Sequence, residues 1–311
     1  MASFKERPED FEVTEVMDFE KQKKGGYSYF LLTKREWGSF EAFKEIAKKA
    51  KIKPNLIGYG GLKDKHAVTH QYISVPEAFG KRLHDARIKD ITLEWVGNND
   101  ERIILGALKG NKFHIIVRDV DEKKELNVDR VKNYFDTQRF GSKALVTGRA
   151  LIQHDFERVC KLMGLKIKDN DPIKALRRIE RRVMRFYTSS YQSWMWNNVV
   201  EQLSDEVEKV PILGYLTEFN NKNVERLYKK LMKEEKINLD NFLLKPFPEL
   251  SSEGSERNVY FNVDDFSYQW EWDELHGGKY KCILDFFLPK GCYATLVVKQ
   301  FFPGVKDKSI S

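Results

Sequence analysis

The sequence predicts a globular chain of mixed class, with strands near both ends and helices in the middle. Strand-like alternation of apolar residues occurs before residue 120 and again from residue 280. From about residue 150 to residue 243 the pattern changes to helical spacing with many charges. A chain of 311 residues with 41% hydrophobic content can form one large domain or two ordinary ones.

The first third is expected to contain strands and one covering helix. Alternating segments predict strands over 11–15, 27–34 and 72–75. Ser39 has the chemistry of an N-cap for a helix that ends before Pro54. One apolar face is expected along this helix, made of Phe40, Phe43, Ala47 and Ala50.

Further along, residues 105–113 predict a hairpin whose turn is Gly110-Asn111, leading into a strand over 113–118. A short helix and then an aromatic loop are expected over 128–141. In the middle, one helix is expected to carry the apolar stripe over 173–183, a second to begin near Ser190, and a third to lie within 221–243.

The last segments predict a return to sheet structure. A link rich in Ser, Glu and Gly over 251–256 marks a boundary, and residues 280–289 are strongly strand-like. After the turn at Lys290-Gly291, residues 292–299 fit either a strand or the start of a helix.

Charge and cysteine content limit the class of protein. The 54 Lys and Arg residues exceed the 47 Asp and Glu residues, which gives a net charge of +7 and fits a polyanionic partner. The three cysteines lack CxxC spacing, which indicates a reducing compartment without structural zinc or a disulfide framework. With no secretion signal and no apolar run long enough to span a membrane, we expect a cytoplasmic protein.

The segment 60–71 contains the strongest candidate for chemistry. Asp64 stands between Lys63 and Lys65 and follows Gly60-Gly61, just before a predicted strand. Neighbouring cations favour an ionised carboxylate, and glycines let the backbone approach a bulky substrate. Asp64 is therefore a candidate nucleophile or base, although an ordinary solvated loop has the same residue types.

The amino-acid sequence of this segment resembles a known family motif. Residues 61–71, GLKDKHAVTHQ, are similar to the catalytic loop of the TruD family of pseudouridine synthases. Further blocks resemble the same family in the same order. They are 8–15 (PEDFEVTE), 105–113 (LGALKGNKF), 133–141 (NYFDTQRFG), 190–197 (SYQSWMWN) and 286–295 (FFLPKGCYAT). An ordered series of blocks spans nearly the whole chain.

The resemblance implies roles for four residues. Asp64 would be the catalytic aspartate, and Lys5 would approach it and keep it ionised. Phe135 would stack on the target base, and Asn133 would position Asp64. One departure is Asp136, which stands where the family usually has glycine.

Several cations are candidate RNA contacts, namely Lys63, Lys65, Lys109, Arg139, Arg178 and Arg182. The last two belong to a run of five arginines over 177–185, in which Glu180 is the only local acid. This run fits either contact with an RNA backbone or a surface helix neutralised by a neighbouring element.

The fold that the resemblance implies is α+β: a bent, mixed and mostly antiparallel sheet with flanking helices, plus an inserted TruD-type α/β domain. The catalytic domain would be discontinuous, over 1–149 and 256–311, and the inserted domain would cover 150–255. The implied reaction is isomerisation of uridine to pseudouridine in tRNA, at uridine 13. Because enclosure keeps the detached uracil in place, we expect no cofactor or metal to be needed. The sequence leaves the oligomeric state open, and we expect a monomer.

The isomerisation requires the target base to leave the stack. The sequence leaves open whether Asp64 attacks the sugar or removes a proton from it, and it identifies no general base for C5. One alternative is a non-catalytic RNA-binding protein or RNA chaperone that keeps the cleft. A methyltransferase or zinc deaminase is disfavoured, because the glycine fingerprint and the H-x-E with P-C-x-x-C pattern are missing.

Overall fold

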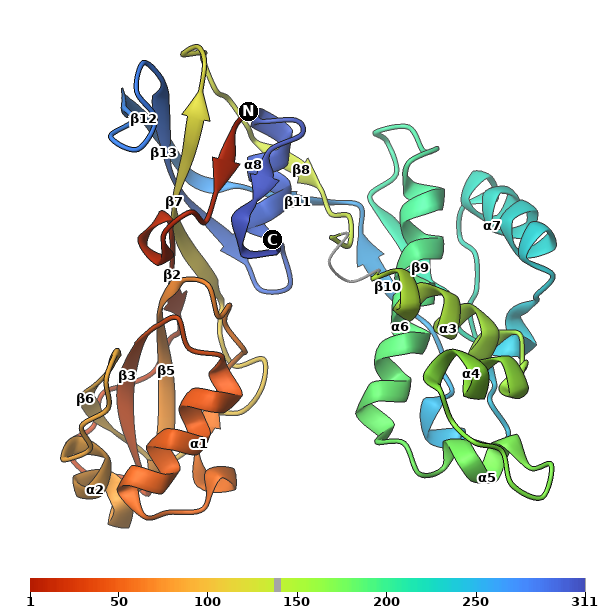
Figure 1. The fold of residues 1–311 in the computed structure, drawn as a ribbon, viewed down its shortest axis with the longest axis horizontal. Helices are drawn as coiled ribbons and strands as arrows, with labels where there is room; N and C mark the ends of the chain where they lie inside the picture. The colour runs from red at the N-terminus through yellow and green to blue at the C-terminus, as the bar shows by residue number, and fades with distance from the viewer. Residues whose placement is uncertain (137–140, 311) are drawn as a thin grey trace. The chain divides into compact units, whose positions relative to one another are not determined.

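The structure is a computed structural model that describes residues 1–136 and 141–310. Two compact units make up the chain (Figure 1). The first unit comprises Met1–Val131 and Phe261–Ser311, and the second comprises Lys132–Tyr260. The units thus divide at 131 and 260, where the sequence led us to expect 149 and 256, because residues 142–152 form a helix that packs inside the second unit.

The first unit is built on a ten-stranded sheet whose main path runs β12-β13-β7-β2-β5-β3-β6. These strands are β2 (Phe11–Val16), β3 (Tyr27–Arg35), β5 (Val68–Pro76), β6 (Ile91–Asn99), β7 (Gly110–Val120), β12 (Asp264–Trp272) and β13 (Tyr280–Pro289). Short strands β1 (Ser3–Phe4), β4 (Gly58–Tyr59) and β14 (Lys306–Asp307) attach to it. Along the path only β2 and β5 pair in parallel, so the sheet is mixed and largely antiparallel.

Two hydrophobic cores hold this sheet to its helices. Helices α1 (Ser39–Ala50) and α2 (Gly80–His84) pack against β3, β5 and β6 through Phe43, Ile46 and Leu83. Helix α8 (Ala294–Phe301) packs against β7 and β13 in the second core, through Val297 and Val298. Strand β2 lies between β7 and β5 in the sheet, and it pairs with β5 in parallel. The segment 60–67 connects β4 to β5.

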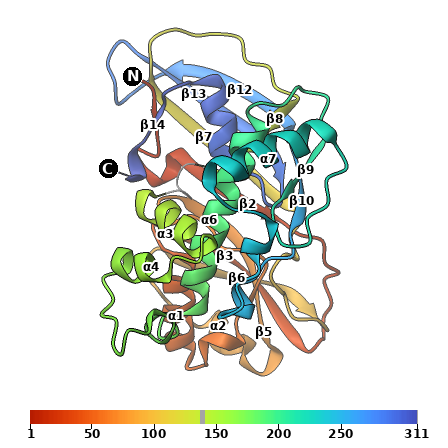
Figure 2. The ribbon, with the colours of Figure 1, turned by 90° about the vertical axis from the view of Figure 1, so that its right-hand side faces the viewer.

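The two ends of the chain meet on the first unit. Strand β1 pairs with β14 in parallel and with β7 in antiparallel register, so that Ser3 lies opposite both Lys306 and Arg118. Figures 1 and 2 show the N- and C-termini near these strands. The register fixes the position of the residues that follow β1, which include Lys5.

The second unit is mainly helical. Its helices are α3 (Ser142–Ile152), α4 (Phe156–Met163), α5 (Pro172–Leu176), α6 (Arg181–Val200) and α7 (Lys222–Glu235). Helix α3 packs along α6 and next to α4 (Figure 2), and their buried core includes Leu151, Val159 and Met184. Strands β9 (Lys209–Ile212) and β10 (Ser255–Asn258) form one small ladder, and β8 (Arg130–Lys132) and β11 (Tyr260–Asn262) form another at the boundary between the units.

The predicted fold class is confirmed, and most predicted strands are found, but several local predictions are wrong. Gly110-Asn111 is not a turn: it opens β7, where a Cβ on Gly110 would lie 2.2 Å from the Leu288 carbonyl oxygen. Residues 130–132 form β8 rather than a helix. The arginine-rich segment is broken at 177–180 into α5 and α6, and α6 runs through Ser190 without a new start. For residues 292–299 the sequence allowed either a strand or the start of a helix, and the structure has the helix α8 over 294–301.

Candidate active site

Asp64 lies in the segment 60–67 with its main chain held and its carboxylate exposed. The side chain is 55% exposed to solvent. The fully buried Lys34 of β3 donates from its ammonium to the carbonyl oxygens of Asp64, at 2.7 Å, and Trp37, at 2.6 Å. A buried donor thus fixes the backbone of Asp64 and leaves its side chain free to meet a substrate.

Lys34 was not among the residues that the sequence singled out. In β3 it follows Phe30 and Leu32 at alternate positions, on the side of the strand that faces the core, and a cation at such a position was the available signal. Burial lowers the pKa of Lys34 to about 8, the charge of Asp64 opposes this shift, and the Lys63 ammonium adds to it.

The hydroxyl of Ser39 also holds the loop. It accepts a hydrogen bond from the Lys63 amide (2.9 Å) and donates to the Lys63 carbonyl (3.1 Å). The expected N-cap role of Ser39 is wrong, because Gly38 occupies that position. Gln71 adds a third anchor by donating to the Gly61 carbonyl (3.1 Å).

Lys5 supplies a cation to the Asp64 carboxylate. Its Nζ lies 3.4 Å from Asp64 Oδ2 and 3.9 Å from Asp307 Oδ2. The Lys5 side chain is 5% exposed, and its ammonium stands 4.1 Å from the centre of the Phe11 ring. Lys5 adopts a φ of 60°, an uncommon conformation for lysine that only a well-held environment maintains.

The two lysines next to Asp64 pair with other acids. The Lys63 ammonium is buried against Glu15, which is itself fully buried. The Lys65 ammonium lies 3.6 Å from Glu41 on the surface. The carboxylate's cation therefore comes from the N-terminal segment, and the sequence neighbours do not contact it. Of the two expected RNA contacts here, Lys65 is exposed, whereas the Lys63 ammonium is not.

Gly60 is closely packed. A Cβ at this position would meet Met17 Cε at 3.1 Å, and the Gly60 carbonyl accepts a hydrogen bond from the Gly106 amide at 2.7 Å. The same neighbourhood contains Lys109, whose exposed ammonium pairs with Asp18. Lys109 is accessible, and its contact with RNA stays a prediction.

Asn133 and Phe135 lie in the second unit and are buried. Arg257 donates to the carbonyl of Asn133 at 2.9 and 3.1 Å and stacks over the Phe135 ring, 4.1 Å from its centre. Trp196 meets the same ring edge-on at 5.6 Å. The side chain of Asn197 makes two hydrogen bonds to the Phe135 backbone, each of 2.9 Å: Oδ1 accepts from the Phe135 amide, and Nδ2 donates to the Phe135 carbonyl. The structure thus brings Asn133 and Phe135 together in one unit and Lys5 and Asp64 in the other.

The position where the family usually has glycine is compatible with aspartate. Asp136 is buried, with 4% of its surface exposed, and its backbone does not take a positive φ. A side chain is accommodated there without the strain that would favour glycine. Arg139, the next expected RNA contact, lies outside the described residues.

The arginine run is partly neutralised within its own unit. Arg181 lies 3.3 Å from the Glu249 carboxylate, and Arg185 donates to the Glu249 carbonyl at 3.1 Å. Arg182 pairs with Glu180. Glu249, which lies outside the arginine run, therefore neutralises part of its positive charge. This agrees with the interpretation of a surface helix neutralised by a neighbouring element.

Arg178 and Arg182 nevertheless remain accessible. Arg178 lies in the exposed turn between α5 and α6. The Arg182 side chain is 77% exposed even though it is paired. Contact of either residue with RNA stays a prediction.

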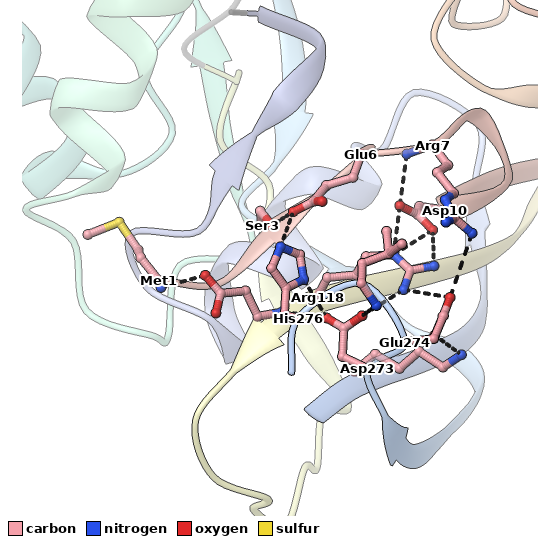
Figure 3. Close-up of polar contacts among 12 residues, drawn as sticks. Met1, Ser3, Glu6, Arg7, Asp10, Arg118, Asp273, Glu274 and His276 are labelled. Atoms are coloured by element: carbon pink, nitrogen blue, oxygen red, sulfur yellow. Dashed lines mark hydrogen bonds and ion pairs between the residues drawn. The ribbon is translucent and has the colours of Figure 1, made fainter. Parts of the chain in front are cut away.

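A buried ionic cluster, shown in Figure 3, holds the segment that carries Lys5. Arg118, which is 2% exposed, donates to both oxygens of Asp10 at 2.8 to 3.0 Å. It also donates to Asp273 at 2.9 Å and to Glu274 at 3.0 Å. The sequence did not reveal this cluster, because Arg118 is 108 residues from Asp10 and 155 from Asp273.

The carboxyl group of Asp273 is held ionised in this cluster. Burial alone would raise its pKa, but hydrogen bonds from the Asp119 and Leu275 amides, from His276 and from Arg118 lower it to about 2. The cluster is thus charged and hydrogen-bonded. We regard it as structural support for the N-terminal segment.

Within residues 1–136 and 141–310, no helix is both long and apolar enough to cross a membrane. The same part of the chain contains no group of three or more His, Cys, Asp or Glu side chains arranged to hold a metal ion.

Comparison with known proteins gives consistent results. The family model described as tRNA pseudouridine synthase D (TruD) matches residues 1–169 and 204–301. A relative from Methanocaldococcus jannaschii, named "Probable tRNA pseudouridine synthase D 2", is 30% identical over 97% of this chain and 92% of its own length. A relative from Methanococcus maripaludis, named "Probable tRNA pseudouridine synthase D 1", is 26% identical over 96% of this chain and 99% of its own length.

A solved structure from Methanosarcina mazei that carries the TruD name aligns with a TM-score of 0.77 at 23% identity. It covers 96% of this chain and 93% of its own, and it shows that the fold is shared. The family model leaves out residues 170–203, which contain the arginine run, and includes the Asp64 loop and the N-terminal block. The chain therefore belongs to the tRNA pseudouridine synthase D (TruD) family.

Proposed function

We propose that this protein isomerises uridine to pseudouridine in tRNA, with uridine 13 as its target and Asp64 as the catalytic group. The observation that carries the proposal is the exposed Asp64 carboxylate on a fixed backbone, with the buried Lys5 ammonium 3.4 Å away. A reacting group must be accessible and correctly aimed, and this pair combines both properties.

The reaction rearranges bonds without hydrolysis. The bond between C1′ and N1 breaks, the uracil rotates while it remains bound, and its C5 bonds to C1′. C5 then loses its proton and N1 gains one, so the composition does not change. An ionised Asp64 serves either as a nucleophile on C1′ or as a base toward a sugar proton. Both routes need a carboxylate that reaches the sugar of an extruded nucleotide.

Lys5 acts as a positioning residue in this proposal. Its positive charge stabilises the negative charge on Asp64, and its burial limits the directions that the ammonium can take. The Asp307 carboxylate, 3.9 Å from the same ammonium, also attracts it. The second oxygen of Asp64 has no hydrogen bond to another described side chain, which leaves it available to the substrate.

The remaining roles follow from the family resemblance and stay predictions. Phe135 stacks on the target base, Asn133 positions Asp64, and Lys65, Lys109 and other surface cations contact the RNA backbone. Because the ring of Phe135 is 7% exposed and already lies under Arg257, we expect some local rearrangement when a base binds. We further propose that the protein works in the cytoplasm as a monomer on its tRNA substrate.

The test is tritium release from tRNA labelled at uridine C5. Asp64→Asn and Asp64→Ala should reduce release by at least about a thousandfold, in the range that acid–base groups supply, while tRNA binding stays within about threefold. Asp85→Asn serves as the control, because the Asp85 side chain is similarly exposed, at 64% against 55%, in the same unit. Wild-type turnover by the Asp64 variants would reject the assignment. Salt-dependent binding without release by the unmutated protein would favour the non-catalytic alternative.

A further inference from the structure

Exposed apolar side chains gather around the Asp64 loop. Among the described residues, ten large apolar side chains are exposed, and four of them are close to this loop along the chain or through its anchors. We call these four the apolar rim. They are Phe40 (50% exposed), Leu62 (51%), Ile104 (66%) and Leu105 (73%).

Each member of the rim is tied to the segment that carries Asp64. Leu62 belongs to that segment, two residues before Asp64. Phe40 follows Ser39, whose hydroxyl is bonded to Lys63. Ile104 and Leu105 precede Gly106, whose amide donates to the Gly60 carbonyl at 2.7 Å. The rim residues and the carboxylate are therefore linked through the segment 60–67.

Ile104 and Leu105 are exposed although hydrogen bonds hold the backbone on both sides of them. On one side the amide of the buried Ile103 donates to Ser74 Oγ at 2.9 Å. On the other side the Gly106 carbonyl accepts from the Lys290 ammonium at 2.8 Å. A backbone held at both ends presents two apolar side chains to solvent, which is unfavourable unless a partner covers them.

A cavity of about 510 Å³ lies behind this tip and indicates the chemistry of the partner. Phe19 and Tyr29, whose rings are 5.0 Å apart, line it together with Arg102 and Asn99. Three acidic residues also line it, Asp18, Glu20 and Glu101, of which Asp18 is paired with Lys109. Carboxylates repel phosphate but accept hydrogen bonds from the amino groups of bases.

We propose that the apolar rim packs against unstacked bases that flank the target uridine, and that the cavity behind Leu105 receives the edge of one of them. This inference rests on the proposed function, because extrusion of one nucleotide leaves its neighbours with exposed faces. Apolar side chains that cover such faces lower the cost of opening the RNA. The rim thus adds to the catalytic carboxylate a surface that keeps the opened RNA in place.

The test uses tRNA with 2-aminopurine beside the target uridine, because the fluorescence of this base rises when it unstacks. The measurements are made with Asp64→Asn protein, which binds without turnover. We expect a clear rise with Asp64→Asn and loss of at least half of it when Leu105→Ser is added. Leu105→Met should retain the rise, since its side chain still covers a base.

The matched control is Leu216→Ser, which removes a leucine that is 61% exposed in the second unit. It should leave the fluorescence unchanged. In the protein with Asp64 intact, Leu105→Ser should reduce kcat/KM for tritium release about tenfold, and Leu216→Ser should not.

Three results separate the alternatives. An unchanged fluorescence rise in Leu105→Ser would overturn the role of the rim. A fall of more than about 5 °C in the Tm of the RNA-free Leu105→Ser protein, with the rise intact, would assign Leu105 to packing within the protein and also overturn it. Absence of tritium release by the unmutated protein would refute the proposed function, whereas the fluorescence measurement would still show whether the rim binds bases.

Discussion

Two pairs of a carboxylate and a cation in the first unit differ in their exposure to solvent and in the number of hydrogen bonds that join them. Asp10 and Arg118 have side chains that are 0% and 3% exposed and are joined by three hydrogen bonds. Asp64 and Lys5 have side chains that are 55% and 5% exposed, with one contact of 3.4 Å. The first pair satisfies its charges internally, whereas the second leaves carboxylate oxygen for a ligand. A catalytic carboxylate needs to be accessible, correctly placed and able to accept further hydrogen bonds, and the Asp64–Lys5 pair has these properties.

The comparison is tested most strongly by removing the buried cation. Arg118→Met should lower the free energy of unfolding by about 3 to 5 kcal/mol, because Asp10 and Asp273 would stay buried without their partner. Urea denaturation measures this loss. Arg35→Met is the control: it removes an exposed arginine, paired with Glu9 at 2.6 Å, and should lower the free energy of unfolding far less, because solvent screens this pair. Similar losses in both variants would show that the Arg118 cluster does not support the fold as we describe.

Removing the cation of the exposed pair should affect turnover more than stability. Lys5→Met should lower kcat for tritium release about ten- to hundredfold with little change in KM, because the substrate still binds but Asp64 loses its positioning charge. Lys5→Arg should recover part of the activity, which a purely structural role would not predict. An equal effect of both substitutions on Tm alone, with normal kcat, would count against a role for Lys5 at the site.

The buried Lys34 predicts a dependence of stability on pH. Its pKa is lowered from 10.5 to about 8 in the folded protein. Between these values the unfolded chain holds a proton that the folded chain has lost, so stability rises with pH in this window. The unfolding free energy of the unmutated protein relative to Lys34→Met should therefore rise by about 2 kcal/mol between pH 7 and pH 9.5. The exposed Lys44→Met should show no such trend, and a flat difference for Lys34 would refute the shift.

The smallest effect is expected from Asp64 on stability. Asp64→Asn should change the unfolding free energy by less than about 0.5 kcal/mol, as is usual for an exposed side chain with one long contact. Thermal unfolding of the two proteins measures it. A loss close to that of Arg118→Met would place Asp64 among the structural ion pairs.

Much of the fold could be predicted because periodicity reports which faces are buried. Alternation and helical spacing predicted strands over 11–15, 27–34 and 113–118 and a helix from Ser39 to before Pro54, and the structure has them over 11–16, 27–35, 110–120 and 39–50. Phe40 shows the limit of this method. It was expected on the buried face of its helix, but it is 50% exposed, and Ala42 and Ile46 are buried.

The site was predictable only in part. The wording of the loop identified Asp64 through its family, but the partners of the charged residues depend on tertiary structure. Lys63 pairs with Glu15 and Asp64 with Lys5, across 48 and 59 residues of chain. No local pattern encodes such pairings. For the same reason the hydroxyl of Ser39, which fits an N-cap by sequence, bonds to a loop that folding brings beside it.

The measurement that tests the central claim most directly is pseudouridine formation in tRNA treated with purified protein, compared between the unmutated chain and Asp64→Asn. We predict that pseudouridine appears at the uridine with the unmutated protein and stays undetectable with Asp64→Asn, although both proteins bind the tRNA and unfold at the same temperature. Formation of pseudouridine at comparable rates by the two proteins would contradict the account.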